Sequence, residues 1–381
     1  MTRPIGIYVH HHGAGHWQRA CRIATALRRP VTLLGTFNER DTKEARVPLV
    51  DLPDDRIVGF DGDDGEAERP EALHYAPLNH PGIRERMARI AAWIAKADPV
   101  LVIVDVSVEV TLLCRLLSVP TVVVRLAGSR TDAPHLGAFR AATRLIVPYP
   151  AALDAADVPE WVRAKSFFSG FLGSSPVTKG AEDGRIVVVF GQGGRGGCIR
   201  DLAAASRAIP DRTWHVLGPV EGTDDGTPLP SNLHLHGWVE DVDAHLSQAS
   251  LVVGGAGDGV VAAVVAASKR FICLPEPRPY GEQTTKADAL ASLGAAIIHH
   301  GWPSAAAWPD LVRQGMALDA SRIASLADPD ALVRTIAEVE TMAHEIQDGA
   351  DPALETKPAS ECPLRRQPGR RDLVRGRRAQ D

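Results

Sequence analysis

Apolar residues recur along this chain in two patterns, as short continuous runs and as longer segments with helical spacing. The runs IGIYVH at residues 5–10, VLVIVD at 100–105 and RIVVVF at 185–190 are almost wholly apolar. Continuous apolar runs of this length are typical of parallel strands that are buried on both faces of a sheet. Residues 83–96 instead carry apolar side chains at spacings of three and four, which predicts an amphipathic helix. An α/β fold is therefore expected.

The cycle of strand, turn and helix runs twice through the chain, which predicts two doubly wound domains. Each cycle begins with a strand and a glycine-rich loop, first near residue 10 and again near residue 190. Residues 171–184 are rich in Gly, Ser and Pro, and are the expected linker between a domain at 1–170 and a domain at 185–348. The other expected elements are helices at 16–28 and 108–117, and strands at 31–34, 48–52, 121–124, 145–147, 213–217, 233–236, 251–253 and 271–274.

Charge and composition remove several classes of function. The 381 residues carry a formal net charge of −5, and residues 349–381 hold 8 Lys and Arg against 5 Asp and Glu. The rest of the chain is therefore more acidic than the total, which argues against binding of nucleic acid. Because residues 349–381 contain few aliphatic side chains, they are expected to form a disordered basic tail.

The sequence also argues against secretion and membrane insertion. A predicted strand begins almost at the N-terminus, and no apolar stretch with a charged leader precedes it, so no signal peptide is expected. The longest purely apolar run, residues 260–267, is far shorter than the roughly 20 residues of a membrane helix. The 5 cysteines are scattered, which indicates reduced thiols and no zinc framework. A cytoplasmic location is expected.

The first candidate site is the sequence HHHGAGH, which joins the first strand to the first helix. Gly13 and Gly15 allow a sharp turn, and His16 then lies at a helix start, where the helix dipole disfavours imidazolium. A neutral His16 would suit a general base. The alternative is that these histidines only end a strand and start a helix. Metal binding by the adjacent histidines is not expected, because neighbours in a strand point to opposite faces.

A carboxylate at the end of a later buried strand forms the second candidate site. Asp105 ends the run VLVIVD, and ligands of open α/β sheets bind beyond such strand ends. Asp105 either faces an interdomain cleft or caps the next helix.

Two glycine-rich loops of the second domain are candidate phosphate sites. Each loop follows a strand and opens a helix, where backbone amides without side chains can approach phosphate oxygens. The alternative is two ordinary tight turns. The residues predicted to bind the donor in these loops are Gly191, Gln192, Gly193, Gly194 and Arg195, followed by Gly255, Ala256, Gly257 and Asp258.

A polar pair after the next strand forms the last candidate site. Glu282 and Gln283 follow the proline-rich stretch PEPRPYG and begin a helix. A carboxylate and an amide together offer acceptors and donors for the hydroxyl groups of a sugar. The alternative is a polar first helical turn, in which the helix dipole favours Glu.

Taken together, these motifs resemble a GT-B glycosyltransferase, with two Rossmann-like domains that face each other across a cleft. The second domain resembles glycosyltransferase family 28, the family of the peptidoglycan N-acetylglucosaminyltransferases. The likeness is strongest over residues 251–296, where a glycine-rich loop, an alanine-rich helix, a strand ending in Pro275 and Glu282–Gln283 follow in order. The resemblance implies that His16 is the base that deprotonates the acceptor and that Asp105 orients it.

The donor motif departs from the family pattern at several positions. Ala263 stands where these families have an acid that holds the donor ribose. Gly255, Gly259 and Val260 stand where related plant-type enzymes have His, Asn and Ser at the phosphates. The nucleotide and the sugar are therefore left open, as is a loss of activity.

The resemblance implies transfer of a sugar from a nucleotide-sugar donor to an acceptor hydroxyl, with inversion and with no metal or other cofactor. Such transfer would serve glycosylation of the cell envelope or of secondary metabolites. The acceptor would be lipid-linked if the enzyme contacts the inner face of a membrane. On the helix at 83–96, Arg86, Arg89 and Trp93 would form a cationic face for that contact. The alternative is a solvated face with Trp93 at the margin of the core.

Other functions on the same fold remain in competition. A nucleotide-sugar 2-epimerase would need further acidic and basic groups around the sugar. A non-catalytic sugar-nucleotide-binding protein is favoured by the altered donor motif and opposed by the presence of His16 and Glu282–Gln283. A dinucleotide-dependent oxidoreductase is disfavoured, because Gln18 stands where its third glycine would be.

Overall fold

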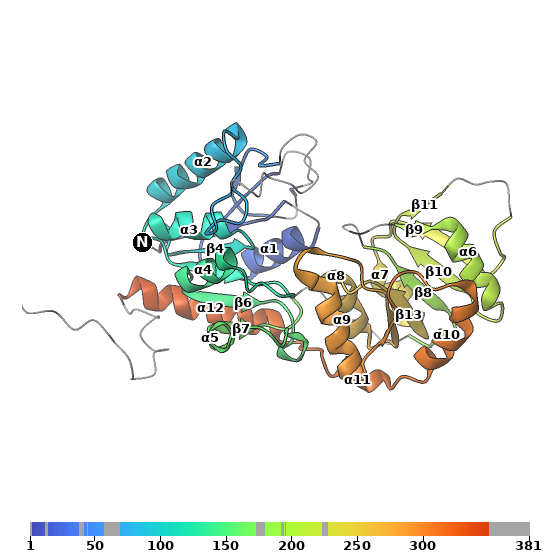
Figure 1. Cartoon of the computed structure of the whole chain (residues 1–381). Coiled ribbons are helices and arrows are strands. Elements are labelled where there is room, and N and C mark those ends of the chain that lie inside the picture. Colours follow the sequence, from blue (N-terminus) through green and yellow to red (C-terminus); the bar gives the residue numbers. More distant parts are fainter. Residues whose placement is uncertain are drawn as a thin grey trace, which may run out of the picture.

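In the computed structural model, the chain forms two α/β domains that lie side by side (Figure 1). Each domain is built around one large parallel sheet with helices packed against it. The expected α/β class with two Rossmann-like domains is confirmed. The structure describes residues 2–11, 14–37, 42–43, 45–56, 69–172, 180–191, 194, 196–222 and 228–349.

The first domain is built on a seven-stranded parallel sheet in the order β3-β2-β1-β4-β5-β6-β7. The first strand lies beside the fourth, so the loops after these two strands meet at the same edge of the sheet. The strands are β1 (Ile5–Tyr8), β2 (Val31–Gly35), β3 (Leu49–Asp51), β4 (Leu101–Asp105), β5 (Thr121–Val124), β6 (Arg144–Val147) and β7 (Ser166–Phe168).

Successive side chains of these strands enter two separate cores. Ile103 belongs to the core shared with the first and last helices, and its neighbour Val104 belongs to the core on the opposite face of the sheet. This alternation explains the continuous apolar run, because both faces of the strand are covered. The helices of this domain are α1 (Ala14–Ala26), α2 (Pro81–Ala97), α3 (Val108–Leu116), α4 (Ala133–Ala141), η2 (Ala151–Leu153) and α5 (Glu160–Ala164).

The second domain is built on a six-stranded parallel sheet in the order β12-β10-β8-β13-β14-β15, and β9 pairs with β11 beside it. Its strands are β8 (Ile186–Val189), β9 (Gly197–Cys198), β10 (Trp214–Leu217), β11 (Val220–Glu221), β12 (Leu233–Gly237), β13 (Leu251–Gly254), β14 (Phe271–Cys273) and β15 (Ile297–Ile298). Its helices are α6 (Ile199–Ala208), α7 (Val242–Gln248), α8 (Asp258–Ala267), η3 (Pro279–Gly281), α9 (Glu282–Ser292), η4 (Ala305–Ala307), α10 (Trp308–Met316) and α11 (Ala320–Ala324).

The last helix, α12 (Ala331–Gln347), differs from the expected domain at 185–348, because it packs on the first domain (Figure 1). Val339 and Met342 are buried in the first domain's core, and burial of these apolar side chains stabilises the packing of α12 on that domain. The Glu338 carboxylate accepts a hydrogen bond from Arg144 Nε at 2.9 Å. Residues 331–347 therefore belong structurally to the first domain.

The cationic face expected on α2 does not form. Arg86 is 1% exposed, and its guanidinium donates to Tyr8 Oη at 2.9 Å and to Thr36 Oγ1 at 2.7 Å. Arg89 pairs with Glu85, and the Trp93 ring lies against Gly6 in β1. A buried arginine must satisfy its donors inside the protein, so Arg86 is turned inward and away from the surface. No helix of the described residues is long and apolar enough to cross a membrane.

Several expectations lie outside the described residues. They concern Gly13, Gln192, Gly193, Arg195, residues 173–179 of the expected linker and residues 350–381 of the expected tail.

Candidate active site at the junction of the two domains

His16 and Asp105 meet at the edge of the first sheet, as the topology requires. His16 lies in the first turn of α1, which follows β1, and Asp105 ends the neighbouring strand β4. His16 Nδ1 lies 2.9 Å from Asp105 Oδ2, and the Asp105 side chain is 3% exposed. The two residues predicted to act together are thus in contact.

A third residue, Arg19, completes this group and was not predicted from the sequence. Arg19 Nη2 donates to Asp105 Oδ1 at 3.0 Å and to Asp105 Oδ2 at 2.9 Å, and it also lies 3.0 Å from His16 Nδ1. Arg19 follows His16 by three residues, a spacing that puts two side chains on the same side of a helix. The sequence HWQRA therefore held a signal that could have found it.

The electrostatics of the group keep Asp105 ionised. Burial would raise the pKa of the Asp105 carboxyl, but Arg19 and His16 outweigh burial and hold the pKa well below its usual value. A carboxylate only accepts hydrogen bonds, so the contact with Asp105 favours the tautomer of His16 that has its proton on Nδ1, whereas the contact of Nδ1 with Arg19, which only donates, does not. In the tautomer that Asp105 favours, His16 Nε2 is the basic nitrogen.

The backbone after β4 explains why Asp105 does not act as a helix cap. Ser107 occupies the N-cap position of α3, and its Oγ accepts a hydrogen bond from Val110 N at 3.2 Å. The intervening Val106 has φ of 74°, a left-handed conformation that is costly for a β-branched residue. Such a strained conformation persists only where the surrounding structure holds it in place. The turn directs Asp105 toward His16 and leaves capping to Ser107.

In the second domain, Gln283 holds the candidate donor loop in shape. Gln283 Oε1 accepts hydrogen bonds from Ala256 N at 2.9 Å and from Glu276 N at 2.9 Å, and the side chain is 5% exposed. The amide thus ties the loop before α8 to the loop after β14. A Cβ added at Gly255 would lie 3.1 Å from Gln283 Oε1, so this close approach favours glycine there.

The start of α8 carries a buried charge pair that sequence analysis did not find. Asp258, the first residue of α8, pairs with Lys286 of α9, whose side chain is 0% exposed. Burial would raise the pKa of Asp258, but Lys286 outweighs it and the pKa is lowered, with smaller contributions from Arg19 and His16. Those two contributions come from the first domain, so the α8 start faces the His16 group electrostatically.

A second set of contacts between the domains surrounds Glu282. Glu282 Oε2 lies 3.6 Å from Arg130 Nη2, and the Arg130 guanidinium lies 4.6 Å from the centre of the Tyr280 ring. Ser129 N donates to Tyr280 O at 2.9 Å. Gly128 has φ of 96°, and a Cβ there would lie 2.5 Å from Tyr280 O. Glu282 therefore already has a partner from the first domain.

The loop after β8 also closes tightly on a carboxylate. A Cβ added at Gly194 would lie 2.5 Å from Glu276 Oε1, so the absence of a side chain at Gly194 lets Glu276 approach. Glu276 Oε2 accepts from Arg278 Nη2 at 2.7 Å. Gly194 N donates to Gly191 O at 3.3 Å, as in a turn. Glu276 and Arg278 are thus further charged residues beside this glycine-rich loop.

Comparison with known proteins gives one curated relative and many structural neighbours. No protein-family model matches the chain. A stretch of 125 residues is 29% identical to the UDP-N-acetylglucosamine–N-acetylmuramyl-(pentapeptide) pyrophosphoryl-undecaprenol N-acetylglucosamine transferase of an Exiguobacterium species. This match covers 31% of the chain, and it spans only 35% of the length of that relative.

The structural neighbours match almost the whole chain. MurG of Acinetobacter baumannii has a TM-score of 0.62 at 16% identity, and the match covers 90% of this chain and 100% of that one. The glycosyltransferase SnogD of Streptomyces nogalater has a TM-score of 0.63 at 17% identity, with 90% and 100% covered. A UDP-glucosyltransferase of Polygonum tinctorium has a TM-score of 0.66 at 14% identity, with 90% and 99% covered. The chain has the GT-B fold, and its sequence is in part similar to a transferase of the MurG type.

Proposed function

We propose that this protein is a glycosyltransferase that moves a sugar from a nucleotide-sugar donor to an acceptor hydroxyl. The observation that carries the proposal is the group formed by His16, Asp105 and Arg19, at the same junction as the start of α8. A base that is oriented by a buried carboxylate is the machinery needed to activate a hydroxyl nucleophile.

In the proposed reaction, His16 Nε2 removes the proton of the acceptor hydroxyl as its oxygen attacks the anomeric carbon. The bond from that carbon to the diphosphate oxygen breaks, and the electron pair leaves with the nucleoside diphosphate. Attack from the face opposite the leaving group inverts the anomeric centre. Asp105 stabilises the imidazolium that forms on His16, as a buried carboxylate does for a catalytic histidine.

The second domain would hold the donor mainly through its backbone. Gly257 occupies the N-cap of α8, where backbone amides and the helix dipole favour an anion such as the diphosphate. Gln283 Oε1 is already taken by two backbone amides, so its Nε2 group is the donor that remains for a sugar hydroxyl. Glu282 would share its carboxylate between Arg130 and the sugar.

We propose the acceptor class from the sequence relative and not from a cavity. The hollow beyond the ends of β4 and β5 has room for about one water molecule, so it is too small to hold an acceptor. The similarity to a transferase that acts on a pyrophosphoryl-undecaprenol substrate is consistent with a lipid-linked acceptor.

A thermal-shift screen of the full chain tests the donor assignment. Nucleoside diphosphates and their sugars are added separately, and a specific ligand raises the unfolding temperature by mass action. We expect one nucleotide series to stand out, and we expect its sugar conjugate to yield a glycosylated product with an acceptor alcohol. A chain that is stabilised by no nucleotide would contradict the proposal.

Non-catalytic binding of a sugar nucleotide is the second candidate function, and one observation favours it. Ala263 is half-buried against the core of the second domain and offers no carboxylate to a ribose. Tight donor binding without any transfer or hydrolysis of the sugar would favour this candidate over the transferase.

A further inference from the structure

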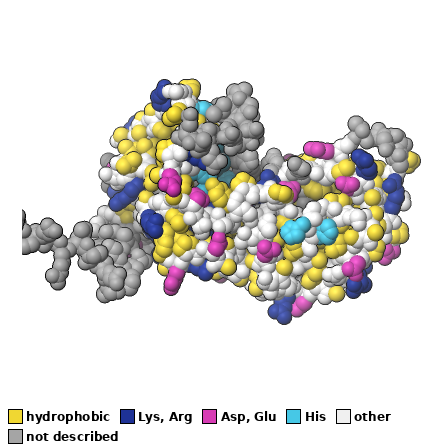
Figure 2. Space-filling model, viewed as in Figure 1, with side chains coloured by type: hydrophobic (Ala, Val, Ile, Leu, Met, Phe, Trp, Pro, Cys, Tyr) yellow, Lys and Arg dark blue, Asp and Glu magenta, His cyan; other side chains and the backbone are white. Residues whose placement is uncertain are grey.

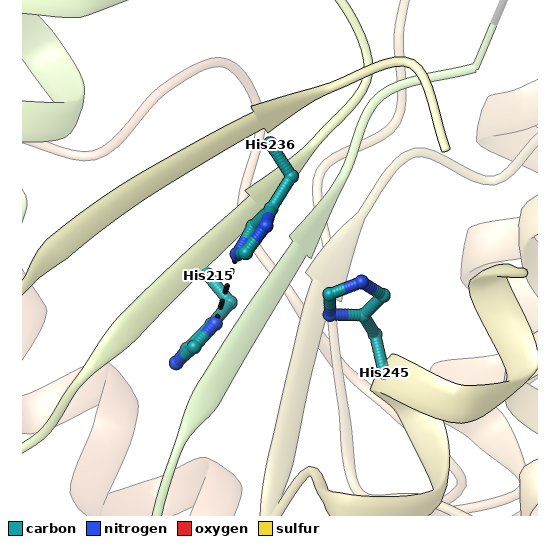
Figure 3. A group of neighbouring side chains, drawn as sticks. All are labelled: His215, His236 and His245. Atoms are coloured by element: carbon teal, nitrogen blue, oxygen red, sulfur yellow. Dashed lines mark hydrogen bonds between the residues drawn. The ribbon is translucent and has the colours of Figure 1, made fainter.

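Three histidines gather in the second domain on the α7 face of its sheet (Figure 3). His215 lies in β10, His236 lies in the neighbouring edge strand β12, and His245 lies in α7. Trp214 and Val216 are buried in the core on one face of the sheet, so the intervening His215 points to the other face. The alternation in WHVL and LHLHG thus places histidines side by side on one surface.

The ring nitrogens of these histidines converge on one space. One nitrogen from each residue lies within 4.8 Å of the others. His215 Nδ1 and His236 Nε2 are 3.0 Å apart, and their rings are stacked at an interplanar angle of 12°. The His245 ring is set at 60° to the His236 ring, with centroids 4.7 Å apart. A register shift in the pairing of β10 with β12, between Val216 and Leu217, adjusts the two strands at this point.

These distances are close to those of a zinc site. Zinc–nitrogen bonds of about 2.0–2.1 Å in a tetrahedron put neighbouring nitrogen atoms about 3.3 Å apart. His215 and His236 already meet this spacing, and rotation of the His245 side chain closes the remainder. In the hydrogen bond between these two nitrogens, one of them carries the proton, and a change of tautomer that moves this proton to the other nitrogen of its ring frees both lone pairs for the ion.

The ligand set selects the kind of ion. Imidazole nitrogens suit borderline ions such as Zn²⁺, whereas Mg²⁺ and Ca²⁺ prefer oxygen ligands.

The other group of metal-ligand type among the described residues is less suited. It contains His11, Asp54 and Asp55 in the first domain. Asp54 is paired with Arg56, and Asp55 Oδ1 lies 3.4 Å from Arg86 Nη2. These arginines already neutralise the two carboxylates, which are therefore less available to a cation.

We propose that His215, His236 and His245 bind one Zn²⁺ ion, with water at the fourth position. The ion cross-links the edge strand β12 and its neighbour β10 to α7, and so stabilises the edge of the second sheet. The site is separate from His16 and Asp105, and it takes no part in the proposed transfer.

Zinc titration of the untagged full chain tests the site. The protein is stripped with EDTA, dialysed and titrated with ZnCl₂ by calorimetry, and MgCl₂ is titrated in parallel. We expect one equivalent of Zn²⁺ to bind and Mg²⁺ to give no heat of binding. Even residues behind a ligand can change metal affinity about 10–100-fold, so loss of a ligand in His245→Gln should weaken zinc binding at least tenfold.

His234→Gln is the matched control. The His234 ring lies 4.9 Å from that of His215 on the same strands, but His234 is outside the converging group. We expect its zinc affinity to stay within about twofold of the parent chain, because it provides no ligand. Thermal melting in EDTA checks that both variants fold, and zinc should raise the melting temperature of the parent and of His234→Gln but not of His245→Gln.

Two results would overturn the proposal. One is equal zinc affinity in His245→Gln and the parent chain. The other is a loss of the bound equivalent in His11→Gln, which would move the ion to the first domain.

Discussion

The two domains bring different chemistry to their junction. The first domain contributes side chains with charge or acid–base function, in which His16 and Arg19 share the Asp105 carboxylate. The second domain contributes the loop before α8, which Gln283 holds in place by accepting a hydrogen bond from Ala256 N. Figure 2 shows histidine side chains where the two domains meet.

Substitutions in the two domains should therefore have different effects, on the transfer rate in the first domain and on stability in the second. Substitution of His16 or Asp105 in the first domain should directly slow proton transfer. Removal of a polar side chain around the second domain's loop leaves a backbone amide or a buried charge without its partner. The first expected effect is therefore a lower free energy of unfolding, and any loss of donor affinity comes in addition.

The largest effect is expected from His16→Ala. Loss of a general base should lower the transfer rate about 10²–10⁴-fold, while donor affinity should change little, because His16 belongs to the other domain. Steady-state transfer and calorimetric titration of the donor give the two quantities. Asp105→Asn should show a smaller loss of rate, since it keeps the shape of the residue that orients His16. A His16→Ala chain with parental turnover would show that another group is the base.

The next effect is expected from Lys286→Met, on stability. The substitution leaves the Asp258 carboxylate without its buried partner, and such losses cost about 3–5 kcal/mol. We expect the lower end of that range, about 3 kcal/mol, because the Asp258 side chain is 24% exposed. Urea unfolding measures the loss.

The double variant Lys286→Met with Asp258→Asn is the control for this pair. It removes both charges, so it should recover most of the lost stability, as coupling between contacting residues predicts. An equal loss in the single and double variants would mean that packing at Lys286, and not charge, is responsible.

A smaller effect is expected from Gln283→Ala. It leaves Ala256 N and Glu276 N without their acceptor, at a cost of about 1–3 kcal/mol in the free energy of unfolding. Gln283→Glu keeps the acceptor and removes the Nε2 donor, so it should keep most of that stability. It should also weaken the nucleotide sugar more than the bare nucleoside diphosphate. Equal weakening of both ligands would remove Gln283 from the sugar site.

The smallest effect on turnover is expected from metal removal. The proposed transfer uses a histidine base and backbone amides, so EDTA should leave the rate within about twofold of its starting value, because no metal takes part in that general-base step. The rate is measured before and after dialysis against EDTA. Loss of turnover that a divalent ion restores would contradict the mechanism.

The fold could be predicted from the sequence because its strands are buried on both sides. The run VLVIVD became β4, whereas the short β7 and β15 gave too little pattern to be recognised. The resemblance to the glycosyltransferase family paired His16 with Asp105, and the order of the sheet, with β1 beside β4, explains why the two residues meet. Lys286 could not be found, because its partner Asp258 lies 28 residues away on another helix. The inward turn of Arg86 depends on Tyr8, which is equally remote in sequence.

The return of α12 to the first domain has a consequence for how the chain is made. In chain order, the second domain is an insertion within the first, because Met342 and Ala343 complete a core that begins at Ile5. During synthesis the first domain stays unfinished until the end of α12 has left the ribosome. All strands of the second domain precede α12 in the chain, so this domain can fold first. Domains in this protein should therefore mature in the reverse of their order along the sequence.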